Sequence, residues 1–230
     1  MRRSRVTKPG RVVRRSGGTT MHTRVTDQAV LFYTAASVFS NFHPAPFVMR
    51  PYLPLRSRPA GAGRRPTVEA PPSTPVAELL NAATDPSRPA VRFGHAEQFL
   101  MAAKAAVFAD TPSLDMLLAA RDITPAAAKR AGRAVVGFDQ AAWNAEVREV
   151  AFVTCLAKFS SSPERKAALL DTLPHSRRLV EASPRDRVWG VGLGIANPDA
   201  EVPSKWRGRN LLGEALERVR AVLAAQPPEQ

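Results

Sequence analysis

The sequence of 230 residues contains one cysteine, Cys155, and no long hydrophobic run. A single cysteine cannot form an intrachain disulfide, and it excludes a zinc site built on two or more thiolates. Nowhere does the chain approach the ~20 uninterrupted apolar residues that a membrane span requires, and its N-terminus lacks the apolar core of a secretory signal. We therefore expect a cytoplasmic protein with no membrane partner.

The common signatures of catalysis are also missing. The chain has neither the GxxxxGK[ST] pattern of a phosphate-binding loop nor the HExxH pattern of a zinc peptidase, and its four histidines lack metal-ligand spacing. The glycine-rich stretch 190–194 does not form GxGxxG and no long helix follows it, so a dinucleotide-binding turn is not expected. Cys155 lies on the apolar side of a predicted helix, which favours a core thiol over a nucleophile. We expect no metal site.

Positive charge is concentrated at the N-terminus. The chain has 33 lysines and arginines against 20 acids, a net charge of +13. Residues 1–24 hold eight of these bases and no acid, whereas the other 206 residues carry 25 bases and 20 acids. Residues 1–27 lack apolar periodicity, so we expect a disordered basic tail. Three interpretations stay open: a segment without function that precedes a start at Met21, an arm that binds nucleic acid by counterion release, and a transit peptide.

The rest of the chain predicts one folded domain, residues 28–225, interrupted by a proline-rich insertion. Segment 51–89 holds nine of the 21 prolines and is expected to be a loop of polyproline character rather than core. Hydrophobic residues make up 44% of the chain, enough for one sizeable core. Long helix-forming segments with few short apolar runs predict an α+β fold that helices dominate.

Apolar periodicity and capping residues place the expected elements. Helices are expected over 96–110, 114–120, 125–132, 143–159, 163–173 and 210–225, and short strands over 29–33, 179–181 and 188–193. Thr124 is the predicted N-cap of the third helix, and Pro125 suits its first turn.

Three clusters place polar side chains among aromatic ones. In chain order they are Ser40-Asn41-Phe42, Glu97-Gln98 with Lys104, and Glu181-Ala182-Ser183 with Asp186, Trp189 and Gly190. Each residue alone has a commonplace explanation. A carboxylate such as Glu97 is favoured at a helix start by the dipole, Asp186 suits a turn, and Trp189 suits a core. Only their combination points to chemistry.

Six short segments occur in a fixed order. They are FSNFHPAPF at 39–47, AEQFLMAAKAAVF at 96–108, AAAKRAGRAVVGFDQAAW at 126–143, KF at 158–159, LLDTLPHSRRLVEASPRDRVWGVGL at 169–193 and WRGRNLLGEAL at 206–216. Together they resemble the NADAR family, the YbiA-like N-glycosidases associated with NAD and ADP-ribose metabolism. The chain departs from the family pattern at Gln98-Phe99, where the family often has His-Tyr, and in the ~40 proline-rich residues after the first motif.

The resemblance implies a helix-dominated α+β fold and hydrolysis of the N-glycosidic bond between a ribose (phosphate) and a nitrogen base, without a metal or organic cofactor. Substrates attributed to the family are ribosylated pyrimidine intermediates of riboflavin synthesis and, in other branches, ADP-ribose attached to guanine bases. The expected partner is a small phosphorylated ribosyl or ADP-ribosyl substrate; nucleic acid, bound by the basic tail, would suit the second class. A non-catalytic ADP-ribose or nucleotide reader is the alternative.

Cleavage of this bond develops positive charge on the anomeric carbon. Carboxylates stabilise that charge and position or deprotonate the attacking water. We expect Glu97 and Asp186 to be the catalytic pair, with Glu97 as general base or cation stabiliser. Asp186 would bind ribose hydroxyls or support protonation of the leaving base. The enzymatic interpretation depends on these two carboxylates lying beside one sugar ring.

The remaining predicted site residues bind substrate. Trp143 and Trp189 are expected to stack on the base or exclude water, and Lys104, Arg133 and Lys158 to bind phosphate. The other candidates are Ser40, Asn41, Phe42, Glu181, Gly190 and Asn210. Among them Asn41 and Asn210 offer amides to ribose or base edges, although helix capping stays open as the role of Asn210.

Overall fold

The computed structural model describes residues 22–49, 90–173 and 177–226. Within them α-helices dominate, and five short strands form two small sheets, which confirms the predicted α+β class. The chain divides into two compact units, which we call the central unit, residues 41–166, and the terminal unit, residues up to 40 and from 167 onward. The predicted insertion 51–89 and residues 1–21 of the predicted tail lie outside the described residues.

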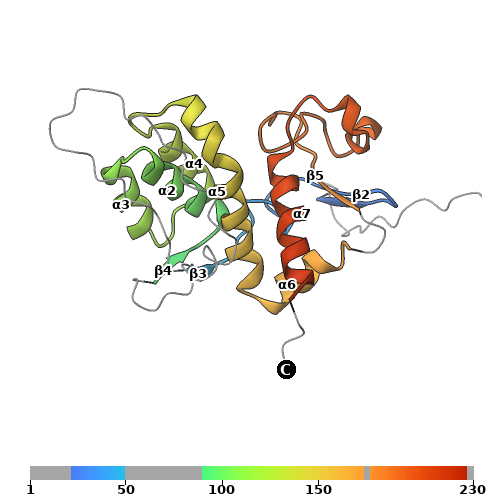
Figure 1. Ribbon diagram of the computed structural model, residues 1–230, viewed down its shortest axis with the longest axis horizontal. Helices are drawn as coiled ribbons and strands as arrows, with labels where there is room; N and C mark the ends of the chain where they lie inside the picture. The colour runs from blue at the N-terminus through green and yellow to red at the C-terminus, as the bar shows by residue number, and fades with distance from the viewer. Residues whose placement is uncertain (1–21, 50–89, 174–176, 227–230) are drawn as a thin grey trace, which may run out of the picture. The chain divides into compact units, whose positions relative to one another are not determined.

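The central unit is a helical bundle with a two-stranded ribbon. Strand β3 (Phe47–Met49) pairs antiparallel with β4 (Val91–Phe93). Four helices follow: α2 (Ala96–Val107), α3 (Thr111–Ala119), α4 (Pro125–Arg133) and α5 (Gln140–Ser160) (Figure 1). Each helix begins after a residue whose side chain accepts the backbone N–H three positions on, namely His95, Asp110, Thr124 and Asp139.

Helix α2 is the buried centre of this unit. It contacts α3, α4 and α5, and all residues from 96 to 103 are buried. Alanines along α2 allow close approach, and an added Cβ at Gly132 of α4 would collide with Met101 of α2. At the N-terminal end the Phe99 ring meets Phe93 edge-on, with 5.2 Å between centroids. The helix that carries Glu97 is therefore held by packing along its length.

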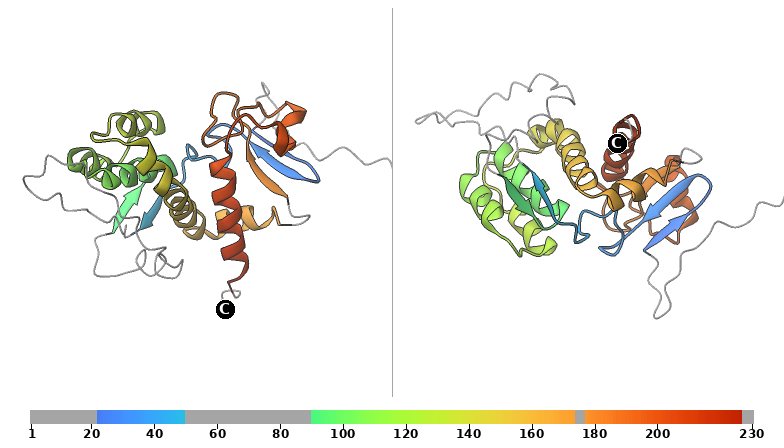
Figure 2. Two further views of the ribbon diagram at one scale, coloured as in Figure 1. Left: turned by 45° about the horizontal axis from the view of Figure 1, so that its top comes forward. Right: turned by 90° about the horizontal axis from the view of Figure 1, so that it is seen from below.

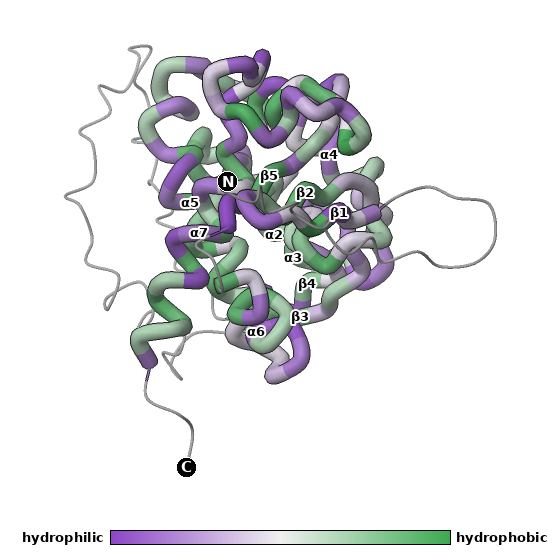
Figure 3. Tube along the Cα trace, turned by 90° about the vertical axis from the view of Figure 1, so that its right-hand side faces the viewer, coloured by the Kyte–Doolittle hydropathy of each residue, from purple (hydrophilic) through white to green (hydrophobic). Residues whose placement is uncertain are grey.

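The terminal unit is built on a three-stranded sheet. Its strands β1 (Thr23–Val25), β2 (Ala29–Phe32) and β5 (Arg178–Glu181) lie in the order β1-β2-β5 (Figure 2). β2 is antiparallel to β1 and parallel to β5, with Phe32 opposite Glu181. All four residues of β2 are apolar (Figure 3). All four are also buried, as is typical of a strand covered on both faces.

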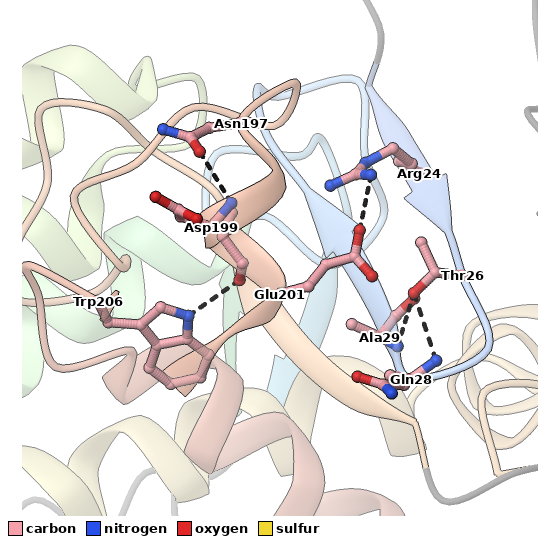
Figure 4. Close-up of polar contacts among 9 residues, drawn as sticks. Arg24, Thr26, Gln28, Ala29, Asn197, Asp199, Glu201 and Trp206 are labelled. Carbon is pink, nitrogen blue, oxygen red and sulfur yellow. Dashed lines mark hydrogen bonds and ion pairs between the residues drawn. The ribbon is translucent and has the colours of Figure 1, made fainter. Parts of the chain in front are cut away.

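Further helices complete the terminal unit. Helix α7 (Leu211–Ala224) packs on β5, and the division between the units falls within α6 (Pro163–Leu170). The 3₁₀ helices η2 (Pro198–Glu201) and η3 (Pro203–Lys205) follow β5. Glu201 pairs with Arg24 of β1 at 2.7 Å, and the Trp206 indole N–H donates to the Ala200 carbonyl at 2.9 Å (Figure 4).

Side chains, not a fourth strand, cover the open edge of β5. The backbone N–H of Leu179 donates to Glu217 Oε1 at 2.8 Å, and that of Glu181 donates to Asn210 Oδ1 at 3.0 Å. Asn210 Nδ2 returns a bond to the Leu179 carbonyl at 2.9 Å. Buried backbone groups need such partners, so Asn210 and Glu217 act in the place of a neighbouring strand.

Most predicted elements are confirmed with shifted ends. The strands expected at 29–33 and 179–181 are β2 and β5, and the six expected helices are α2 to α7. Thr124 caps α4, as predicted. No helix in the described ranges is long and apolar enough to cross a membrane.

Two expectations about strands were wrong. Residues 23–25, assigned to the disordered tail, form β1, because their backbone pairs with β2 although their side chains lack an apolar pattern. Segment 188–193 is not a strand. Its carbonyl groups at Val188 and Trp189 accept the N–H groups of Leu211 and Leu212 at the start of α7, both at 3.2 Å. Helix-end donors therefore take the bonds that a partner strand would have used.

We predict that Gly213→Ala destabilises the fold. A Cβ at this position would lie 2.0 Å from the Leu179 carbonyl oxygen and 2.2 Å from Asn210 Nδ2. Alanine normally stabilises a helix by about 1 kcal/mol relative to glycine, but forcing α7 away from β5 should cost roughly 3 kcal/mol. Denaturant titration would measure the change.

Gly194→Ala is the matched control, because no atom lies within 4 Å of its added Cβ. Its free energy of unfolding should stay within about 0.5 kcal/mol of the native value. Equal stability of the two variants would contradict the close approach of α7 to β5.

Candidate functional site

The predicted site residues fall in both units. The central unit contains Asn41, Phe42, Glu97, Lys104, Arg133, Trp143 and Lys158, and the terminal unit contains Ser40, Glu181, Asp186, Trp189, Gly190 and Asn210. The predicted catalytic pair, Glu97 and Asp186, takes one residue from each unit, so its convergence stays a prediction.

The first two sequence clusters meet at the start of α2. The Glu97 backbone N–H donates to the Asn41 carbonyl at 3.0 Å, and both residues are buried, with Glu97 only 2% exposed. Glu97 lies in the first turn of α2, where the helix dipole favours a negative charge. A carboxylate so deep in the protein acts strongly on a nearby cation, because little water screens it.

His95 and Gln98, which lie close to Glu97 in sequence, fix the first turn of α2. His95 Nδ1 accepts the Gln98 N–H at 3.1 Å, while its Nε2 bonds the Ile123 carbonyl at 2.9 Å and therefore carries the proton. Burial lowers the pKa of His95; the bond to Ile123 raises it, and the charge of Lys158 lowers it. Gln98 Nε2 donates to the carbonyls of Leu117 and Ala120 at 2.8 and 2.7 Å.

The supporting roles of these two residues were not predicted from sequence. Gln98 belongs to one of the polar sequence clusters without a predicted role of its own, and here its amide ties α2 to the end of α3. His95 precedes a helix-forming run, which is the position of an N-cap. Because histidine is an uncommon capping residue, the sequence did not predict this role.

Lys104 and Trp143 lie in one cluster with Phe138. The Lys104 amine donates to the Gly132 carbonyl at 2.7 Å and stands 4.0 Å from the centroid of the Phe138 ring and 5.9 Å from that of Trp143. Burial lowers the pKa of Lys104. Trp143 is itself buried against Phe108. Lys104 thus supplies a hydrogen-bond donor to a carbonyl in the last turn of α4. The roles expected of Lys104 in phosphate binding and of Trp143 in base stacking stay predictions.

Lys158 is an extreme case of a buried cation. It is 1% exposed on α5, and burial lowers its pKa to about 7. The electrostatic effect of Cys155 raises this pKa, and that of Arg165 lowers it further. Cys155 is 1% exposed, which agrees with the predicted core thiol. The pKa of Lys158 therefore lies near neutral pH, far below that of an exposed phosphate-binding lysine.

The other predicted residues of the central unit lie nearer the surface. Arg133 is exposed in the last turn of α4. Phe42 is half-buried, with the Lys129 amine 5.5 Å from its ring centroid. In the described ranges no three side chains of the His, Cys, Asp or Glu type gather as a metal would require.

In the terminal unit, Asp186 organises the loop after β5. Its Oδ1 accepts the N–H groups of Val188 and Trp189 at 2.9 and 2.8 Å, and its own N–H donates to Ser183 Oγ at 3.2 Å. Asp186 is half-buried. The turn thus fixes the direction of its carboxylate before any ligand arrives.

Because Gly190 has no side chain, the backbone carbonyls of Glu181 and Asp186 can both lie close to it. A Cβ on Gly190 would lie 2.7 Å from the Glu181 carbonyl oxygen and 3.1 Å from that of Asp186. Asn210 fixes the same region from the other side, since its amide binds both Leu179 and Glu181. It occupies the N-cap position of α7, but its side chain makes no capping bond. Positioning of Glu181 is therefore the observed role of Asn210.

Comparisons with known proteins agree with this architecture. Residues 31–224 match the NADAR domain model. The protein irg-1 of Caenorhabditis elegans is 32% identical over 211 residues, 88% of this chain and 86% of that protein. A protein of Acanthamoeba polyphaga mimivirus named N-glycosidase is 34% identical over 126 residues, 54% of this chain and 71% of that protein. The NMR structure of Escherichia coli YbiA aligns with a TM-score of 0.55 at 22% identity, covering 87% of each chain, which shows a shared fold.

We predict that Lys158 makes stability rise with pH. Below pH 7 the amine is charged in both states, and the native state bears the full cost of burial. Between about pH 7 and 10.5 the native state has lost the proton that the unfolded state still holds, so stability increases by on the order of 5 kcal/mol across this window. Lys158→Met should remove that rise, as measured by denaturant titration from pH 6 to 10.

Lys205→Met serves as the control, since this lysine is exposed on η3. It should retain the native pH profile. A Lys158→Met protein with an unaltered profile would show that the amine does not change its protonation on folding.

Proposed function

Because the chain belongs to the NADAR family, we propose that it is a hydrolase that cleaves the N-glycosidic bond between a ribose carbon and a nitrogen base. The observation that carries this proposal is the 34% identity to a viral protein named N-glycosidase, of which the alignment covers 71%. In the reaction, water adds to the anomeric carbon, the carbon–nitrogen bond breaks, and the base leaves with a proton.

Glu97 is the proposed general base or cation stabiliser. The transition state carries positive charge on the sugar ring, and a carboxylate held in a site with little water stabilises such charge without reorganising. The burial of Glu97 and the support of its helix turn by His95 and Gln98 suit this task. Deprotonation of the attacking water by a fixed carboxylate typically raises the rate a hundredfold or more.

Asp186 is the proposed ligand of the ribose hydroxyls or helper in protonating the leaving base. Two backbone N–H groups hold its Oδ1, so the carboxylate direction is set in advance. Trp189 follows in the same turn and is half-buried. An indole in this place can stack on a base, an interaction worth about 1–3 kcal/mol.

Two substrate classes follow from the proposed bond. The first is a ribosylated aminopyrimidine phosphate of the kind found in riboflavin synthesis. The second is ADP-ribose attached to a guanine base, free or in nucleic acid. Both place a ribose anomeric carbon next to a ring or amino nitrogen, so the same hydrolytic chemistry would suit both. A non-catalytic nucleotide reader is the outcome if ligands bind and no bond breaks.

We predict that Glu97→Gln lowers kcat by roughly a hundredfold or more. Glutamine keeps the shape of the side chain and removes its charge and basicity. Asp186→Asn should lower kcat/KM while preserving the turn, because the asparagine oxygen still accepts the N–H groups of Val188 and Trp189. Mass spectrometry of the base released from a ribosylated aminopyrimidine and from ADP-ribosylated guanosine would measure both.

Asp115→Asn is the control, because Asp115 is exposed on α3 and its charge should not matter to turnover. Native rates in folded Glu97→Gln and Asp186→Asn proteins would remove both carboxylates from the chemistry. Tight ligand binding without base release by the native protein would identify a reader.

A further inference from the structure

Exposed arginines gather on the loops that carry Asp186 and Trp189. Arg185 and Arg187 flank Asp186 in the turn after β5, and Arg207 lies in the segment before α7; all three are exposed. Sequence-based prediction assigns no role to these three arginines. It places phosphate binding at Lys104, Lys158 and Arg133 instead, of which Lys158 is buried in the core.

The backbone builds this cluster. The Arg209 N–H donates to the Arg187 carbonyl at 2.9 Å, and the Arg207 N–H donates to the Val191 carbonyl at 2.9 Å, so the two loops run side by side. A Cβ added to Gly192 would lie 3.0 Å from Arg207 Cβ and 3.2 Å from Arg187 Cγ. The stems of Arg187 and Arg207 therefore lie together over Gly192, although they start from positions twenty residues apart.

The charge of the cluster is not neutralised within the described part of the chain. The side chains of Arg185, Arg187 and Arg207 form no hydrogen bond or ion pair with described residues. The carboxylates of η2 are already engaged, Glu201 with Arg24 and Asp199 with Lys205 at 2.6 Å (Figure 4 shows the first pair). Gathering like charges costs free energy unless an anion joins them, and the guanidinium fork matches phosphate oxygens in geometry.

We propose that Arg187 and Arg207, with Arg185 beside them, bind the phosphate groups of the substrate. This inference rests on the proposed function, because it places the phosphate next to the turn whose Asp186 would bind the ribose. The ligand class is a phosphate ester or pyrophosphate on the ribose side of the scissile bond. The substrate is then a nucleotide rather than a nucleoside.

Phosphate can reach these arginines from two sources. One is a small ribosyl phosphate or ADP-ribosyl compound, and the other is the backbone of a nucleic acid that carries the modified base. The chemistry at the guanidinium groups is the same, but a strand contacts several cations and its affinity falls steeply with salt. Inorganic pyrophosphate and a fluorescein-labelled 12-nucleotide single strand are therefore the two probes.

The test uses the full chain with Arg187→Gln and Arg207→Gln together. The control is Arg121→Gln with Arg130→Gln, which removes the same charge from exposed positions of the central unit. Calorimetry should show pyrophosphate binding at least tenfold weaker in the first variant and within twofold of native in the control. If nucleic acid is the source, anisotropy should show strand binding whose salt slope falls by about 1.4 in the first variant only, because each phosphate contact on a single strand contributes about 0.7 to the slope.

Turnover separates this inference from the proposed function. The loss of kcat/KM in the Arg187→Gln, Arg207→Gln protein should be at least tenfold larger for a ribosyl phosphate than for the matching nucleoside. Equal losses for the two substrates, or pyrophosphate affinity equal to that of the control, would overturn the phosphate site. If the native protein releases no base yet pyrophosphate binding still depends on the pair, the site stands and the hydrolase proposal fails.

Discussion

The open edge of β5 is the constraint on which the terminal unit depends. A strand with one free edge must satisfy its buried N–H and carbonyl groups, and here Asn210 and Glu217 do so from the chain segment of α7. This arrangement is possible only because Gly213 has no side chain. It fixes α7 against β5 and, through the bonds of Val188 and Trp189 to the start of α7, fixes the loop that carries Asp186. One edge of one strand thus sets the positions of the acidic residues and the arginines that follow it.

The central unit depends on a different device, the burial of polar groups that support each other. Gln98 is fully buried, yet its amide bonds two carbonyls and accepts the Gly94 N–H at 2.9 Å. Satisfied networks of this kind rigidify a core, whereas unsatisfied ones destabilise it. Burial of Lys158 lowers the stability of the same unit near neutral pH, since it holds the pKa of the amine far below that of a lysine in water. A protein that keeps such a group in its core accepts lower stability near neutral pH.

Much of the fold was predictable because local rules and packing agree. The helix-forming runs, the Thr124 cap and the apolar strand β2 all follow from residue type and spacing, and the structure confirms them. Prediction failed where the decisive partner is distant in sequence. Segment 188–193 has the apolar content of a strand, but its carbonyl groups bond to Asn210, Leu211 and Leu212. β1 has little strand signal of its own and forms because β2 offers it a partner.

The sequence by itself determined the family and the list of acidic and aromatic residues, because short motifs in a fixed order carry that information. The tertiary structure alone decided which polar residues serve the scaffold. Asn210 bonds β5, Lys104 bonds the last turn of α4, and His95 and Gln98 hold the turn of Glu97. It also brought Arg187 beside Arg207. Spacing along a chain cannot show such contacts, since the partners are joined only by the hydrogen bonds and close packing of the folded state.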